Sequence, residues 1–192
     1  VYHLAGCAHD VNNINSDEVY KKINTQATLD PANMAIKNGV KKFIFISSVK
    51  ASKSSDIYGK SKYEAEQKLI KISKESDMHI SIIRSSLVYG PNVKGNLKSM
   101  LDGIKGGWFP PLPETNNRRS MIHIDDLVSA ILFVSHKETS NGEVFIATDG
   151  RNYSSRDIYN ILCGLVNKKI PNWSIPNFIF DIISYLSPTI KF

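Results

Sequence analysis

Two side chains in this sequence could act together to move a proton. Tyr58 and Lys62 are four residues apart in the segment Tyr58-Gly59-Lys60-Ser61-Lys62, and on a helix that spacing places both on one face. A phenol with a pKa of about 10 is a poor base at neutral pH, and a cation held close to it favours the phenolate. The same spacing occurs in ordinary surface helices, so the pair indicates acid–base chemistry only if its surroundings agree.

The residues before Tyr58 favour the catalytic interpretation. Lys42 to Ile46 is an apolar, aromatic and β-branched run, typical of a strand buried on both faces, and it leads into Ser47 and Ser48. Ligands bind at the carboxyl ends of parallel strands, so a serine hydroxyl there could share a substrate oxygen with Tyr58. The alternative is that both hydroxyls bond to nearby backbone in a turn.

The elements that must position these residues alternate between strands and helices. The predicted strands are 1–4, 42–46 and 80–84, and the predicted helices between them are 16–38 and 57–74. Helices of this length between strands imply right-handed crossovers and therefore a parallel, doubly wound α/β sheet. Beyond residue 95 we expect a smaller α+β lobe, with helices at 96–105, 125–136 and 154–167, a strand at 143–147 and a Pro-rich loop at 106–117.

The first predicted helix contains several recognisable signals. In chain order they are an N-cap at Ser16, an apolar side at Val19, Ile23 and Ala27, a kink or restart at Pro31, and a C-cap at Asn38-Gly39.

Composition excludes several classes of protein. The 192 residues are 42% hydrophobic and 22% charged, which supports a packed core and argues against wholesale disorder. The net charge of +6 comes from lysines that are scattered singly or in pairs, so no stripe for a nucleic-acid backbone is expected. No apolar stretch approaches the ~20 residues needed to cross a bilayer. Cys7 and Cys163 lack metal-ligand spacing and fit reduced thiols in a cytoplasm, so no metal is expected.

Motifs along nearly the whole chain resemble one family. The chain is similar to the extended short-chain dehydrogenase/reductase superfamily, and within it to the NAD-dependent epimerase/dehydratase family that acts on nucleotide sugars. The closest similarity is to bacterial 4-epimerases and 4-ketoreductases of surface-polysaccharide pathways. The segments that carry this resemblance are Val1–Gly6, Asn24–Thr28, Phe43–Ser48, the Tyr58/Lys62 pair, Ile83–Pro91, Val93–Leu97 and Asn117–Leu127.

The resemblance implies a role for each matching residue. Ser48, Tyr58 and Lys62 would form the catalytic triad. The implied cofactor-binding residues are Leu4, Ala5, Gly6, Asn24, Ser47, Tyr58, Lys62 and Ser85. Besides Ser48, the implied substrate-binding residues are Asn96, for the nucleotide, and Arg119, whose planar guanidinium suits a diphosphate.

Three further features of the matching segments have simpler explanations. Asp125 and Asp126 are expected to cap the helix that follows them. His123 is expected to be packed and hydrogen-bonded. Trp108 and Phe109 are expected to cover the apolar lobe in preference to stacking on a base.

The same resemblance predicts the division of the chain. Residues 1–95 would form a partial Rossmann-like NAD(P)-binding domain with the triad, and residues 96–192 a substrate-binding lobe interleaved with it. The family's Gly-x-x-Gly-x-x-Gly turn does not occur in the sequence, so we expect the Rossmann-like fold to be N-terminally incomplete, with its first βαβ units upstream.

These features together lead to a functional expectation. Val49-Lys50 stands where family dehydratases carry Asp-Glu, which disfavours dehydration. We expect an NAD-dependent nucleotide-sugar epimerase in the cytoplasm, acting at carbon 4 of a UDP-hexose or UDP-N-acetylhexosamine. NADP is the alternative cofactor, and a homodimer is an open option. The alternatives are an NAD(P)H-dependent 4-ketoreductase and, in another class, a non-catalytic nucleotide-binding protein or truncated relic.

Overall fold

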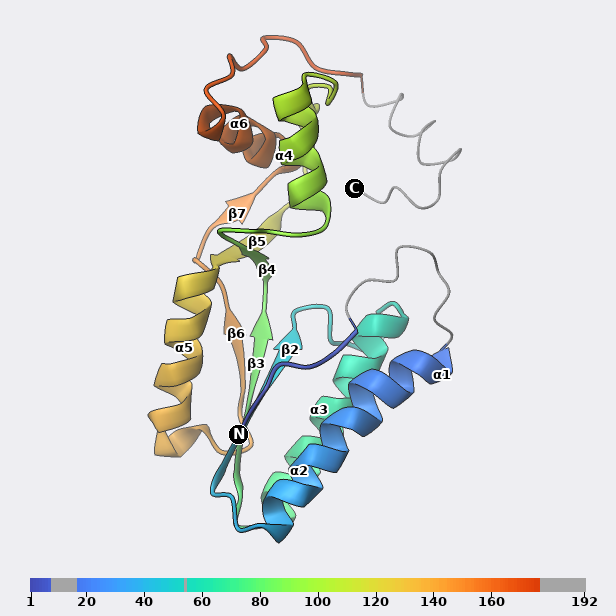
Figure 1. Ribbon diagram of the computed structural model, residues 1–192, viewed down its shortest axis with the longest axis vertical. Helices are drawn as coiled ribbons and strands as arrows, with labels where there is room; N and C mark the ends of the chain where they lie inside the picture. The colour runs from blue at the N-terminus through green and yellow to red at the C-terminus, as the bar shows by residue number, and fades with distance from the viewer. Residues whose placement is uncertain (8–16, 54, 177–192) are drawn as a thin grey trace. The chain divides into compact units, whose positions relative to one another are not determined.

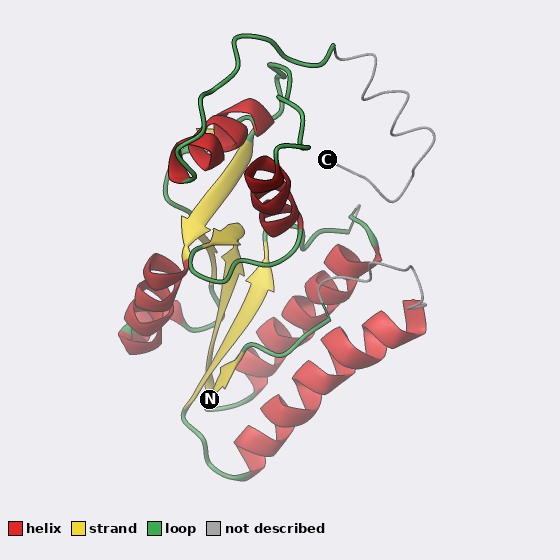
Figure 2. Cartoon of the chain, turned by 45° about the horizontal axis from the view of Figure 1, so that its top comes forward, coloured by secondary structure: helices red, strands yellow, loops and turns green. Residues whose placement is uncertain are grey.

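A parallel four-stranded sheet organises the first part of the protein. The computed structural model describes residues 1–7, 17–53 and 55–176. The strand order is β1-β2-β3-β6, and all three neighbouring pairs are parallel (Figures 1 and 2). The strands are β1 (Tyr2–His3), β2 (Lys42–Ser48), β3 (His79–Ser85) and β6 (Val144–Ala147). The predicted parallel α/β architecture is confirmed.

Helices cover both faces of this sheet, as a doubly wound fold requires (Figure 1). On one face lie α1 (Asp17–Tyr20), the π-helical turn η1 (Lys21–Gln26), α2 (Ala27–Lys37) and α3 (Ile57–Glu75); on the other lies α5 (Ile124–His136). The core beneath α2 and α3 consists of apolar side chains with almost no exposed surface: Ala32, Phe43, Phe45, Ala65, Leu69, Ile80 and Ile82.

The predicted apolar side of the first helical segment is wrong. Ile23 is 39% exposed, whereas Asn24 and Thr25 are buried. The physical reason is η1, whose i→i+5 pairing changes the phase of the helix and turns these polar residues inward. They are accepted there because they find partners; the Thr25 hydroxyl, for example, donates to the Ser61 carbonyl of α3 at 3.0 Å. Ser16, the predicted N-cap, lies outside the described residues.

Both ends of α2 can be related to signals in the sequence. The α-helix restarts at Ala27, four residues before Pro31, so the N–H that proline lacks is the one that would reach the Ala27 carbonyl. At the other end Gly39 has a φ of +67°. The Gly39 and Val40 amides donate to the carbonyls of Ile36 and Ala35 at 3.0 and 2.9 Å, which is the Schellman pattern. The predicted C-cap at Asn38-Gly39 is confirmed.

Helix α3 has a well-defined start, and this start determines where Tyr58 lies. The Asp56 carboxylate accepts a hydrogen bond from the Gly59 amide at 2.8 Å, as an N-cap should. A Cβ on Gly59 would lie 2.3 Å from the Lys50 carbonyl oxygen and 2.2 Å from the Ser55 hydroxyl. The loop before the helix therefore packs directly on its first turn, where only glycine fits.

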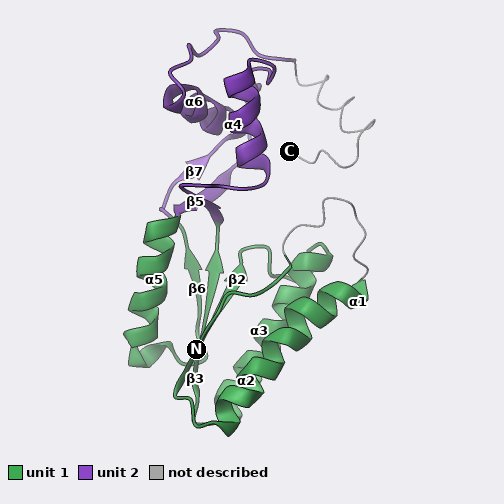
Figure 3. Cartoon of the chain, in the orientation of Figure 1, with its two compact units in different colours: residues 1–86, 124–148 green, residues 87–123, 149–192 purple. Residues whose placement is uncertain are grey.

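The chain divides into two compact units that alternate along the sequence (Figure 3). Unit 1 comprises residues 1–86 and 124–148, and unit 2 comprises residues 87–123 and 149–192. Residues 124–148 belong to unit 1 because β6 pairs with β3, in the register Ile82 with Val144. The segment 96–192 therefore contributes to both units.

Unit 2 is a small α+β structure, but the helix predicted at 125–136 and the strand predicted at 143–147 lie in unit 1 and not in the lobe, because β6 pairs with β3. Its sheet consists of β4 (Leu87–Tyr89), β5 (Arg119–His123) and β7 (Asn152–Tyr153). Its helices α4 (Asn96–Gly106) and α6 (Ser155–Leu165) share an apolar core, on which Phe109 also packs. Trp108 is 69% exposed, so the expected covering role holds for Phe109 alone. No helix among the described residues is long and apolar enough to cross a membrane.

Candidate active site

Helix α3 carries Tyr58 and Lys62 one turn apart, and Lys62 points inward. Its side chain is almost wholly buried, and its Nζ donates to the Ile46 carbonyl of β2 at 3.2 Å. The same Nζ lies 4.7 Å from the centre of the Phe45 ring. Burial lowers the pKa of Lys62 from 10.5 to about 8, although the nearby Glu66 carboxylate opposes this shift. Lys62 is therefore an amine that can change its charge close to neutral pH.

Tyr58 and Ser48 meet across the start of α3 and the end of β2. Burial raises the pKa of Tyr58 above its ordinary value, and a hydrogen-bonding interaction with the Ser48 side chain lowers it by less. The negative charge of the Asp56 carboxylate raises the pKa further. The expected lowering by Lys62 is not found: among the described residues, Lys62 is not one of the groups that shift Tyr58. Its amine is directed at the Ile46 carbonyl instead.

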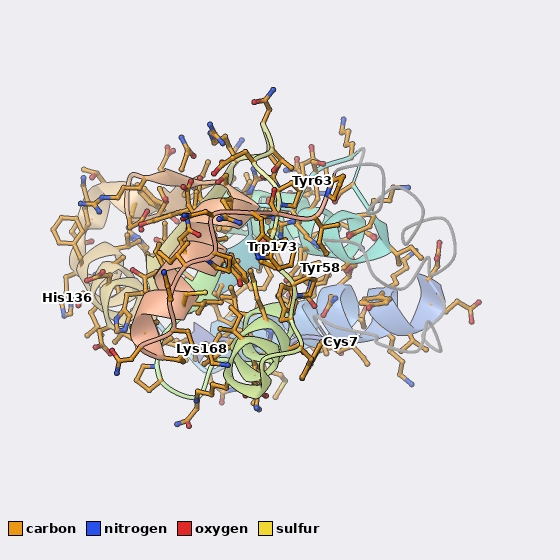
Figure 4. All side chains as sticks on the ribbon, turned by 90° about the horizontal axis from the view of Figure 1, so that it is seen from above. Cys7, Tyr58, Tyr63, His136, Lys168 and Trp173 are labelled. Atoms are coloured by element: carbon orange, nitrogen blue, oxygen red, sulfur yellow. The ribbon has the colours of Figure 1, made fainter. Side chains whose placement is uncertain are left out.

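The segment after β1 brings bare backbone next to Lys62. Leu4, Ala5 and Gly6 are exposed. A Cβ on Gly6 would lie 3.0 Å from both the Lys62 Nζ and the Asn24 Oδ1, so this glycine permits a close approach that a larger residue would disturb. Cys7 follows on the same segment, and Figure 4 labels both Cys7 and Tyr58. Gly6, one of the residues that the family resemblance assigns to the cofactor, thus lies beside Lys62 of the candidate triad.

Asn24 connects this segment to α3. Its buried side-chain amide accepts from the Cys7 N–H at 2.7 Å and donates to the Cys7 carbonyl and the Ser61 hydroxyl, both at 3.0 Å. The Ser61 hydroxyl donates in turn to the Tyr58 carbonyl at 2.7 Å. Asn24 therefore fixes the backbone on both sides of the candidate site.

The serines at the strand ends have different surroundings. Ser48 Oγ accepts from the Lys50 N–H at 3.2 Å, so the turn interpretation holds for Ser48 together with its interaction with Tyr58. Ser85 Oγ donates to the Ser47 carbonyl at 3.2 Å. Ser47 Oγ is buried and has no hydrogen-bond partner among the described residues. A buried hydroxyl of this kind can still bind a ligand atom.

Asn96 and Arg119, which are predicted to bind the substrate, lie in unit 2. Asn96 is exposed at the first position of α4, and Arg119 is half-buried at the first position of β5. The triad residues all lie in unit 1.

The predicted helix caps before α5 are corrected by the structure. Helix α5 begins at Ile124, so Asp125 and Asp126 lie inside its first turn and not at the cap position. In the first turn their negative charges still interact favourably with the positive end of the helix dipole. His123 packs edge-on against Tyr89, with ring centres 5.3 Å apart.

Sequence reasoning missed two residues near the triad. Ser61 joins Asn24 to the Tyr58 turn, and Glu66 lies fully buried one turn after Lys62. The i+4 spacing from Lys62 to Glu66 was the available signal. Within the described parts of the chain, no group of three His, Cys, Asp or Glu side chains could hold a metal ion.

A protein-family model for the NAD dependent epimerase/dehydratase family matches residues 1–147. The chain belongs to this family. Among curated relatives of this epimerase/dehydratase chain, it is 35% identical to a UDP-glucose 4-epimerase of Vibrio cholerae, over 92% of the chain and 59% of that protein. It is also 26% identical to the N-acetyl-alpha-D-glucosaminyl-diphospho-ditrans,octacis-undecaprenol 4-epimerase of Escherichia coli O157:H7, over 92% of the chain and 60% of that protein. The chain thus spans less than two thirds of the length of these relatives.

A solved structure agrees with the family assignment at the level of the fold. The UDP-glucose 4-epimerase of Thermotoga maritima, solved with UDP-glucose, superimposes with a TM-score of 0.77 at 24% identity. The match covers 92% of the chain and 64% of that structure. The epimerase/dehydratase chain therefore has the Rossmann-like fold of these enzymes.

Proposed function

We propose that this protein, in its complete form, is an NAD-dependent epimerase that inverts carbon 4 of a nucleotide sugar. One observation carries the proposal: Tyr58, in hydrogen-bonding interaction with Ser48, is one turn from Lys62 at the carboxyl end of a parallel sheet. A buried phenol beside a serine hydroxyl can exchange a proton with a substrate hydroxyl. The identity to a UDP-glucose 4-epimerase supports this reaction over others of the family.

The residues present fit the nicotinamide end of NAD. A side chain on Gly6 would crowd the Lys62 Nζ at 3.0 Å, so the glycine keeps the backbone close to the amine, and Ser47 offers an unused buried hydroxyl. The backbone of Leu4 to Gly6 and the Lys62 amine would hold the cofactor there. NAD, when bound, supplies the acceptor and donor of the hydride.

The proton chemistry falls to Tyr58 and Ser48. Because its pKa is raised, Tyr58 is protonated at neutral pH and can act as the acid. To act as the base it must first lose that proton, and Ser48 is the neighbour that favours the loss. Ser48 would also hold the carbon-4 oxygen in line with the phenol. Inversion needs no other acid–base group, since the 4-keto sugar turns over and the same phenol returns the proton.

The substrate we propose is a UDP-hexose or UDP-N-acetylhexosamine for surface-polysaccharide synthesis. Arg119 would bind its diphosphate through a bidentate fork, and Asn96 would bind the nucleotide. The undecaprenol-linked substrate of the Escherichia coli relative also carries a sugar on a diphosphate, so it is the main competitor. A cytoplasmic location and a homodimer belong to the same proposal.

One assay on the complete gene product tests this function. UDP-glucose, UDP-N-acetylglucosamine and the undecaprenyl-diphosphate sugar are each incubated with the purified protein, and the 4-epimers are separated by chromatography. Conversion of a UDP-sugar without added reductant supports the proposal. Strict dependence on NADPH would identify a 4-ketoreductase. Conversion of only the lipid-linked sugar would show that the substrate is an undecaprenyl-diphosphate sugar and not a UDP-sugar. Binding without turnover of any substrate would favour a nucleotide-binding protein.

A further inference from the structure

A buried carboxylate lies below the candidate triad on the same helix. Tyr58, Lys62 and Glu66 occupy successive turns of α3, so their side chains lie on one face. Glu66 has no exposed surface at all. Glutamate is among the side chains least often found fully buried unless it is paired, because removing its charge from water is costly.

Arg84 on strand β3 pairs with this carboxylate through both arms of its guanidinium. The Arg84 Nε donates to the two Glu66 oxygens at 2.9 and 3.2 Å, and Nη2 donates to Oε2 at 2.5 Å. The geometry is the bidentate fork that makes arginine–carboxylate pairs both strong and directional. Hydrogen bonding to Glu66 also raises the pKa of Arg84. The pair holds the Glu66 charge in one place.

The charged and titratable groups around Lys62 show why the position of this charge matters. His3 of β1 is buried, and Lys62 helps to lower its pKa, so His3 is neutral and offers no negative charge. Tyr58 is protonated near neutral pH because its pKa is raised. From strand β2, the Ile46 carbonyl and the Phe45 ring lie against the amine. Glu66 is the group that favours the protonated amine of Lys62 against its burial.

We propose that Glu66 and Arg84 are a positioning pair for Lys62: the carboxylate, fixed by the guanidinium fork one helical turn from Lys62, keeps the buried amine charged. The inference deepens the proposed function, since it concerns the lysine of that site. It differs from a purely structural role, in which the pair would only join α3 to β3. A structural tie affects the free energy of unfolding, whereas a positioning pair also sets the titration of Lys62.

Two substitutions separate these roles. Glu66→Gln keeps the shape and removes the charge, but it leaves Arg84 without its partner, so the protein could lose stability for that reason alone. Glu66→Gln with Arg84→Met removes both charges and avoids an uncompensated cation. Glu64→Gln is the matched control: Glu64 lies on the same helix and pairs with Lys68 at 3.0 Å, but its side chain is 39% exposed.

The readout is the titration of Lys62, followed by NMR of 13C-labelled lysine in the complete, unliganded protein and assigned with Lys62→Arg. In Glu66→Gln we expect the Lys62 midpoint to fall by about one pH unit from its parental value, because an opposite charge on the next helical turn is lost. In the double variant we expect a smaller fall, because the Arg84 cation is removed as well. Glu64→Gln should leave the midpoint in place. A double variant that folds normally and titrates like the parent would overturn the proposal.

This measurement does not depend on the enzymatic reaction. If the complete protein proves active, the basic limb of its pH profile should move down with the Lys62 midpoint in the double variant, which a structural tie would not cause. If it proves inactive on every sugar, the proposed function fails while the NMR result still decides the role of Glu66 and Arg84.

Discussion

The Lys62 ammonium donates to the Ile46 carbonyl at 3.2 Å, two residues before Ser48 on strand β2. This bond joins helix α3 to the strand that ends in the candidate catalytic serine. Because Tyr58 lies one turn from Lys62 on the same helix, the bond also fixes the distance between the phenol and Ser48. A lysine that the sequence indicates as an electrostatic partner for Tyr58 is, in the structure, first of all a link between two elements.

Replacing Lys62 should stabilise the fold below pH 8. Burial lowers the pKa of Lys62 from 10.5 to about 8, so between these values the unfolded chain binds the proton and the folded chain does not. Stability of the parent therefore rises with pH across this window, and the full penalty of the buried charge applies below it. Lys62→Met should be more stable than the parent by about 1–3 kcal/mol at pH 7. This advantage should disappear as the pH approaches 10.5.

Urea denaturation at pH 7, 9 and 10.5 measures this difference. Lys60→Met, at an exposed lysine of the same helix, should change stability by less than about 0.5 kcal/mol at every pH. A Lys62→Met variant that is less stable than the parent at pH 7 would contradict the prediction. If the proposed function is right, the variant should nevertheless be inactive.

Tyr58→Phe should abolish most activity with little effect on the fold. The change removes one oxygen from a half-buried ring, so the free energy of unfolding should stay within about 1 kcal/mol. Epimerase kcat should fall by ~10²-fold or more, the usual contribution of a positioned acid or base. Tyr63→Phe on the same helix is the control and should keep full activity. Equal activity of the two variants would rule out Tyr58 as the proton-transfer group.

Asn24→Ala should be among the most destabilising polar-to-alanine substitutions in unit 1. It would leave the Cys7 amide, the Cys7 carbonyl and the Ser61 hydroxyl without their present partner. A hydrogen bond of this kind contributes about 1 kcal/mol, so a loss of roughly 3 kcal/mol is expected from the three together. Asn33→Ala, at an exposed position of α2, should change stability by less than about 0.5 kcal/mol. Urea denaturation of the two variants, with the m-value unchanged, compares their losses of stability through the transition midpoints. Similar losses in both would argue against the Asn24 network.

Two glycine-to-alanine substitutions should have opposite signs. A Cβ on Gly59 would overlap the Lys50 carbonyl at 2.3 Å, whereas one on Gly164 in α6 would meet nothing within 4 Å. Gly59→Ala must therefore displace the loop before α3 and should lower the melting temperature. Gly164→Ala should raise stability by up to about 1 kcal/mol, because alanine is the better helix former. Differential scanning calorimetry of both variants checks the prediction, and a stabilising Gly59→Ala would contradict the packing described.

Much of the fold could be predicted because its signals are local. The buried strand Lys42–Ser48, the helix from Ile57 and the Asn38-Gly39 cap all follow from residue types within a few positions of one another. The Tyr58/Lys62 spacing was readable for the same reason.

The parts that could not be predicted depend on partners distant in sequence. The inward turn of Asn24 depends on Cys7 and Ser61, and the direction of Lys62 depends on Ile46. Glu66 resembles a surface glutamate until Arg84, 18 residues later, is brought against it. The pKa of Tyr58 was expected to fall and instead rises, because burial is a property of the packed structure and cannot be read from spacing.

The π-helical turn at residues 21–26 holds one residue more than an α-helix needs to cover the same rotation. Removing one of its exposed residues, such as Lys22, would allow an uninterrupted α-helix whose flanking turns keep their present orientation. Helix α2 has no such spare residue, so a deletion within it would rotate everything on one side by about 100° relative to the other. A single-codon deletion should therefore be tolerated better within residues 21–26 than within residues 27–37.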